Sequence, residues 1–82
     1  MKTSGNPVFT EAVRVGVKLY ANTKHANELV SAMREQAALN QANVRETGMH
    51  FGFMGAAKLC GDQGAIKRFW QAREVVPIGW RP

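Results

Sequence analysis

Cysteine and long apolar runs are both nearly absent from this sequence of 82 residues. With Cys60 as its single cysteine, the chain can form no internal disulfide, although small secreted domains usually depend on disulfides. No run approaches the roughly 20 apolar residues of a membrane-spanning helix. The first residues also lack the apolar segment of a secretory signal. We therefore expect a protein of the bacterial cytoplasm with no membrane partner.

Residues that bind metals or carry out catalysis are also few. The soft or imidazole ligands are His25, His50 and Cys60, and they show no paired spacing typical of zinc sites. The 6 acidic residues are dispersed, and the Arg–Glu neighbours at 34–35, 45–46 and 73–74 are typical of a solvated helix surface. No glycine-rich segment ends in the Lys-Ser or Lys-Thr of a phosphate-binding loop. The sequence therefore predicts a protein that is not an enzyme and that binds no metal or cofactor.

Acidic residues are outnumbered by the 11 Lys and Arg residues, which gives a formal charge of +5. This charge by itself favours an acidic partner, which can be nucleic acid, an anionic membrane surface or an acidic protein surface. A charge that only keeps the protein dispersed is the alternative. The apolar fraction of 45% is ordinary for a folded chain, and residues 1–82 suffice for one domain of marginal stability. We therefore expect self-association or a partner.

The N-terminal quarter holds one clear helix start and one ambiguous segment. After a flexible lead-in at 1–6, Asn6 can cap a helix whose first residue is Pro7. Apolar residues then alternate with Arg, Gly and Lys over 13–19, which favours a short strand, while helical spacing over the same segment keeps a helix open.

A long central helix is predicted over about 23–47, because this segment lacks proline and glycine and is rich in good helix formers. Gly48 is the expected stop. The fold class is therefore mainly α, with three or four helices around this one. One seam of the helix resembles a heptad in which Asn40 can fix the register of a homodimer. The seam consists of Ala26, Val30, Met33, Ala37, Asn40 and Val44.

The stretch AAKLCGDQGAIKRFW, residues 56–70, predicts two helices joined by a short turn. Asp62 can cap the second helix, which runs from 63 to about 74. A helix-turn-helix needs a small residue at the helix crossing, an apolar residue one turn later, a small turn and two inward apolar residues. Those positions are filled in order by Ala56, Leu59, Cys60–Gly61, Ile66 and Phe69. An ordinary pair of packed helices fits the same pattern.

Over about residues 54–80 the chain resembles the helix-turn-helix family of phage Cro and lambda-type repressors, including the small YdaS-like regulators. The segment VVPIGW is similar to the Val-Pro segment that often follows the recognition helix in the small phage regulators. The resemblance implies a transcription regulator of phage or plasmid type that binds double-stranded DNA as a dimer. It matches Gln63, Lys67, Arg68 and Gln71 to DNA contacts. Gly64 would permit close approach, and Lys58 and Arg73 would add phosphate contacts.

The competing class is a small phage- or plasmid-encoded inhibitor or adaptor. Such a protein would block a host protein by binding to an acidic surface of that host protein. Its anchors would be Phe51, Trp70, Trp80 and Arg81, because Trp and Arg dominate binding hot spots. The two classes differ in what they expose. A DNA-binding regulator should gather its cations on one convex face, whereas an inhibitor should expose an apolar patch around Trp70 or Trp80.

Overall fold

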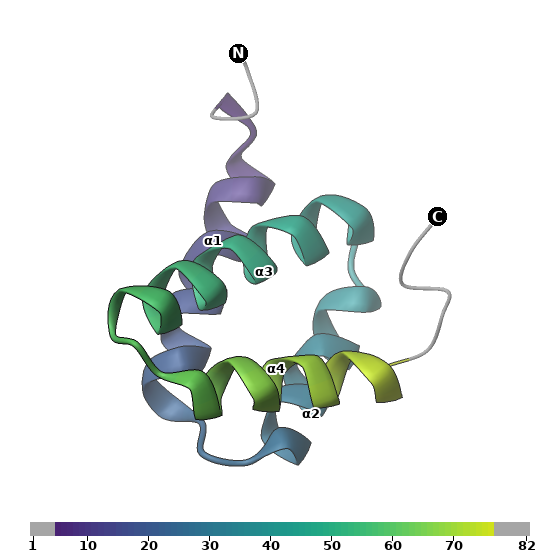
Figure 1. The fold of residues 1–82 in the computed structure, drawn as a ribbon. Coiled ribbons are helices and arrows are strands. Elements are labelled where there is room, and N and C mark those ends of the chain that lie inside the picture. Colours follow the sequence, from purple (N-terminus) through teal and green to yellow (C-terminus); the bar gives the residue numbers. More distant parts are fainter. Residues whose placement is uncertain (1–4, 77–82) are drawn as a thin grey trace.

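A computed structural model of the chain describes residues 5–76 (Figure 1). Within this part the chain forms four α-helices and no strand, which confirms the predicted mainly α fold. None of these helices is both long enough and apolar enough to span a membrane. The helices are α1 (Pro7–Asn22), α2 (Ala26–Ala37), α3 (Ala42–Leu59) and α4 (Gln63–Val75).

Helix α1 begins as the sequence predicts, since the side chain of Asn6 accepts a hydrogen bond from the backbone N–H of Val8 at 2.9 Å. The helix then continues through residues 13–19, so the strand alternative for this segment is wrong. The helical form buries Ala12 and Gly16, while the strand form would have no neighbouring strand within residues 5–76. Packing on the rest of the chain therefore outweighs the β propensity of the valines.

The predicted long helix over 23–47 is also wrong, because the chain breaks between α2 and α3. Gln41 adopts the left-handed backbone conformation with φ of 54°. The buried Arg45 folds back over this turn and donates to the backbone oxygen of Asn40 at 2.7 Å and to its side-chain oxygen at 2.8 Å. Helix α3 then runs through Gly48, the predicted stop, as far as Leu59.

The predicted dimer seam does not form one continuous face. Met33 is buried in the chain's own core, and Val30 and Ala37 pack against that core. Asn40 lies in the turn between the helices, and Val44 belongs to α3. Over α2 the apolar spacing of the seam therefore reflects packing within the chain itself. The seam offers no continuous surface for a homodimer.

Helices α1 and α3 approach so closely that three glycines are required at their contact. A Cβ atom built on Gly16 would lie 2.3 Å from the carbonyl oxygen of Met49, and one on Gly52 would lie 2.2 Å from that of Val13. A Cβ atom on Gly48 would lie 2.7 Å from the Cβ of Ala12 and 2.8 Å from the carbonyl oxygen of Phe9, both in α1. Atoms at these distances overlap with backbone, which cannot move aside as a flexible side chain can, so any larger residue would force the two helices apart.

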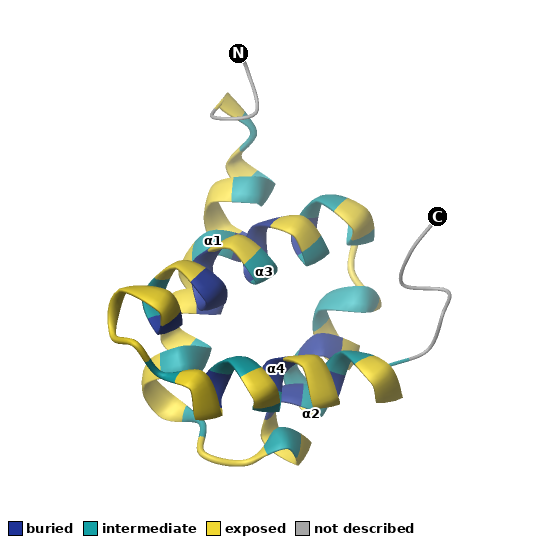
Figure 2. Ribbon diagram, in the orientation of Figure 1, coloured by how far each residue is buried: buried dark blue, intermediate teal, exposed yellow. Residues whose placement is uncertain are grey.

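The core lies between this helix pair and helices α2 and α4 (Figure 2). The ring of Phe53 from α3 stacks on that of Phe69 from α4, with ring centroids 4.8 Å apart. Asp62 caps α4 as predicted, accepting from the N–H of Ala65, and its second oxygen accepts from the hydroxyl of Tyr20 at 3.1 Å. This carboxylate therefore ties the start of α4 to α1.

Substitution of two glycines of α3 by alanine should change stability in opposite directions. Gly52→Ala should destabilise the fold by about 1–3 kcal/mol, because the new methyl group overlaps the backbone of α1. Gly55→Ala should stabilise it by roughly 0.5–1 kcal/mol, because its Cβ meets no atom within 4 Å and alanine favours the helix. Urea unfolding followed by circular dichroism measures both changes. Equal effects of the two substitutions would contradict the described helix contact.

Candidate binding face on helices α3 and α4

The outward side of α3 carries a row of surface hollows. One hollow of about 360 Å³ lies between α3 and α4, lined by Glu46, Thr47, His50, Phe51 and Arg73. A neighbouring hollow of about 380 Å³ is lined by His50, Phe51, Met54, Gly55 and Lys58. A third, of about 250 Å³, lies where α3 meets the start of α1, lined by Asn6, Phe9, Asn43, Val44 and Thr47.

His50 and Phe51 border the first two hollows, and Trp70 of α4 contacts His50. Phe51 is 65% exposed and Trp70 is 47% exposed, which is unusual for such large apolar side chains. We call the surface formed by His50, Phe51, Lys58, Trp70 and Arg73 the α3–α4 face.

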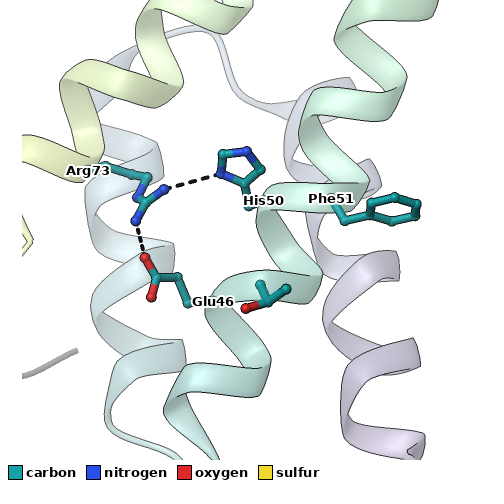
Figure 3. A pocket seen from close by; sticks show the side chains of 5 residues that line it. Glu46, His50, Phe51 and Arg73 are labelled. Carbon is teal, nitrogen blue, oxygen red and sulfur yellow. Dashed lines mark hydrogen bonds and ion pairs between the residues drawn. The ribbon is translucent and has the colours of Figure 1, made fainter. Parts of the chain in front are cut away.

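Arg73 joins the two helices of this face (Figure 3). Its guanidinium forms an ion pair with Glu46 and donates a hydrogen bond to Nδ1 of His50 at 3.2 Å. Both side chains of the ion pair are largely buried, at 14% and 12% exposure. Removing one partner of such a pair leaves a poorly solvated charge, which is strongly destabilising. The pair therefore fixes the separation of α3 and α4 beside the hollow.

His50 is held in its neutral form. Partial burial, and secondly the positive charge of Arg73, lower the pKa of His50 below its usual range. Because an arginine can only donate, Nδ1 of His50 accepts, and the ring proton of the neutral form lies on Nε2. The His50 ring also makes edge contacts with Phe69 and Trp70, at centroid distances of 5.4 and 5.3 Å.

Trp70 is exposed but well supported. The guanidinium of Arg73 lies 5.3 Å from its ring centroid, a cation–π arrangement, and Phe69 meets the ring edge-on. These contacts, with that of His50, restrict the ring in the free protein. A partner would therefore meet a preformed aromatic surface and would lose little side-chain entropy on binding.

The residues predicted to contact DNA are only partly brought together. Arg68 is half-buried and lies close enough to the N-terminus of α2 for its charge to act on Glu28. Arg73 forms an ion pair with Glu46 and a hydrogen bond with His50. Of the remaining five, four lie on α4 and one near the end of α3. These exposed residues are Gln63, Gly64, Lys67 and Gln71, with Lys58.

The predicted inner positions of the helix-turn-helix are met in part. Phe69 is buried and Ile66 packs against the core, as predicted. Leu59, predicted to face inward, is 91% exposed, and Ala57 is buried rather than Ala56. Contacts between α3 and α4 extend from the turn to the Glu46–Arg73 pair, so the helices also meet far from their connection.

Two features of this site were not predicted from the sequence. The Arg–Glu neighbours at 45–46 and 73–74 were expected at the solvated surface, but Arg45 is buried and Glu46 and Arg73 are largely so. Glu46 and Arg73 are 27 residues apart in the chain. No local pattern identifies such a pair. The tail residues Trp80 and Arg81, predicted as anchors, lie outside the described residues.

Cys60 is exposed in the turn before α4. The pKa of the Tyr20 hydroxyl is raised above its usual range. The main cause is hydrogen bonding with Cys60, and burial and the neighbouring Asp62 contribute less. Between residues 5 and 76, no three His, Cys, Asp or Glu side chains come together in a way that could hold a metal ion.

Comparisons with known proteins find no counterpart: no family model, no curated protein and no solved structure matches this chain. The arrangement of the α3–α4 face is therefore the basis for assigning a function.

The lowered pKa of His50 predicts a loss of stability in mild acid. Since the unfolded chain binds this proton more readily than the folded one, stability should be complete above pH about 6.5 and should fall as the pH drops below it. Urea unfolding across this range should show a flatter dependence for His50→Gln. The exposed Leu39, which carries no titratable group, is the control, and Leu39→Gln should keep the wild-type dependence. A wild-type dependence in His50→Gln would contradict this assignment.

Proposed function

We propose that this chain is a non-catalytic binding protein that holds an acidic, partly apolar segment of a partner protein on its α3–α4 face. The observation that carries this proposal is the exposed Trp70, fixed by His50 and Arg73 beside two hollows. Small proteins of this kind act by occupying a surface, as an inhibitor or an adaptor. The phage- or plasmid-encoded class suggested by the sequence fits this mode of action.

The composition of the face favours a protein partner. Arginine and the aromatic residues Trp and Tyr are over-represented among the residues that dominate binding energy. They contribute most to affinity when they are already ordered in the free protein. Phe51 of α3 and His50 line both hollows, and Trp70 of α4 lies next to them through its edge contact with His50. Each hollow can receive an apolar side chain of the partner, and the exposed Phe51 ring lines both of them.

The charge around the face favours an acidic segment. The chain carries a formal charge of +5. The exposed Lys58 of α3 lies three residues from Gly55, and the exposed Lys67 of α4 lies three residues from Trp70. The carboxylate of Glu46 is neutralised by Arg73 and so opposes an acidic partner little. Glu74 is exposed one turn beyond Trp70, so the partner's acidic residues should lie toward the start of α4.

Selection from a displayed random-peptide library tests this proposal with a defined probe. The wild-type chain should enrich acidic peptides that carry a large apolar residue, and their binding should weaken as salt is raised. Trp70→Ser should lose at least about tenfold in affinity for the enriched peptides, as expected for a hot spot.

The matched control is Leu39→Gln, which changes another half-exposed apolar residue, 48% exposed, in the turn between α2 and α3. It should keep wild-type affinity. Failure to enrich acidic peptides, or equal affinity of the Trp70→Ser variant, would contradict the proposal.

DNA binding through α4 is the second candidate, and one observation favours it. Gln63, Lys67 and Gln71 follow a four-residue spacing and are all exposed, so they share one side of the helix. Glutamine can read adenine, and lysine can contact phosphate or guanine. Among these three residues only Lys67 is charged, and Arg73 is paired with Glu46 and His50 on another side of α4, which is why we rank DNA binding second.

Titration of labelled duplex DNA across salt distinguishes the two candidates. If α4 reads DNA, binding should persist at physiological salt with a sequence preference. The double variant Lys58→Ala/Lys67→Ala should then lower the magnitude of the salt slope by about two. Lys24→Ala, at an exposed lysine before α2, is the control and should leave the slope unchanged. Binding seen only at low salt and without preference would eliminate this candidate.

A further inference from the structure

The third hollow, where α3 meets the start of α1, is continuous with the two hollows of the α3–α4 face. Thr47 lines both the third hollow and the first one. Phe9 of the third hollow contacts Phe51, which lines the other two, with ring centroids 6.3 Å apart. The three hollows therefore follow one another along α3, and a segment bound on the face can extend into the third.

The polar groups around the third hollow are mostly satisfied within the chain. The side chain of Asn6 accepts from the N–H of Val8 at 2.9 Å and donates to the side chain of Gln41 at 3.3 Å. The hydroxyl of Thr47 donates to the backbone oxygen of Asn43 at 3.1 Å.

What the third hollow still offers a ligand is mainly apolar. Phe9 and Val44 form apolar walls, and none of the five described residues that line it is charged. A carboxylate placed there would lose water without gaining a cation, which is unfavourable. The third hollow therefore suits an uncharged apolar side chain.

The other end of the row is positively charged. Lys58 lines the second hollow, and the residues that line it on α3 lie up to eleven positions beyond those of the third, as Met54 does from Asn43. Eleven residues of helix span about 16 Å. This exceeds the distance of about 8 Å over which salt screens exposed charges under physiological conditions. A carboxylate of the partner is therefore stabilised by Lys58 at one end of the row and gains little at the other.

We infer that the third hollow binds an uncharged apolar side chain of the same partner segment, which lies along α3 with its acidic residues at the Lys58 end. The inference rests on the proposed function, because it concerns the same segment. Charge complementarity sets the direction, since the reverse placement would bring carboxylates to a hollow without a described cation. To span about 16 Å the segment needs about five residues if extended or about eleven if helical.

A spin label on Cys60 tests the direction of the segment. Cys60 is exposed, is the single cysteine and lies two residues after Lys58, so a nitroxide attached to it marks that end of the row. The probe is an isotope-labelled acidic peptide enriched in the display selection. Its nuclear magnetic resonance signals should be broadened most at the acidic residues and least at the apolar residue furthest from them. The reverse gradient, or uniform broadening, would overturn the inference.

Phe9→Ala tests the third hollow itself. It should weaken binding of the enriched peptide by at least about tenfold while keeping the wild-type salt dependence, because the acidic contacts lie at the other end. Val17→Ala is the matched control, since Val17 is an apolar residue of α1 that is 45% exposed and lines none of the three hollows. It should keep wild-type affinity.

Replacement of the peptide's distant apolar residue by alanine separates a lost contact from a disturbed fold. This change should cost the wild-type chain about tenfold in affinity and the Phe9→Ala variant much less, since neighbouring groups in contact are not additive. Equal losses for both chains would overturn the inference. Wild-type affinity of Phe9→Ala beside a weakened Trp70→Ser would overturn the inference alone, whereas failure to enrich any acidic peptide would overturn the proposed function as well.

Discussion

The backbone contact between α1 and α3 is the constraint on which the rest of this structure depends. It exists because Gly16, Gly48 and Gly52 leave no side chain between the helices. With α1 against one side of α3, Phe53 turns toward α4 and stacks on Phe69. Phe51 leaves α3 on the flank next to α1, where its ring centroid lies 6.3 Å from that of Phe9 and the side chain stays 65% exposed. Exposure of Phe51 and of the hollows beside it is thus a consequence of how the core is assembled.

Charge is distributed differently from what the composition suggests. A basic chain with a basic helix at residues 63–75 is easily interpreted as a DNA-binding protein. Yet Arg45 holds a turn together, and Arg73 joins α4 to α3 through Glu46 and His50. Two cations therefore stabilise the fold and are not free to bind phosphate. What remains exposed near Trp70 is a small number of lysines around an aromatic surface, which favours a protein partner over DNA.

Local signals in the sequence predicted local structure well. The caps at Asn6 and Asp62 depend on neighbouring residues, and both were identified. The choice between strand and helix over 13–19 was left open, because it depends on close packing against glycines of the distant helix α3. The break near Asn40 was missed, because the turn is held by the side chain of Arg45, which folds back onto it. The sequence identified Phe51 and Trp70 as candidate residues of the site, but it did not predict how they are arranged or what holds them. Its organising pair, Glu46 and Arg73, comes from two helices with no shared pattern.

The central claim is that the α3–α4 face, and not the polar side of α4, is the binding surface. Nuclear magnetic resonance of the labelled chain, titrated with an acidic peptide enriched on it, tests this claim most directly. The account predicts that the largest amide shift changes fall at His50, Phe51 and Trp70, with small changes at Gln63 and Gln71. Changes concentrated at Gln63, Lys67 and Gln71, with Phe51 and Trp70 unaffected, would contradict it.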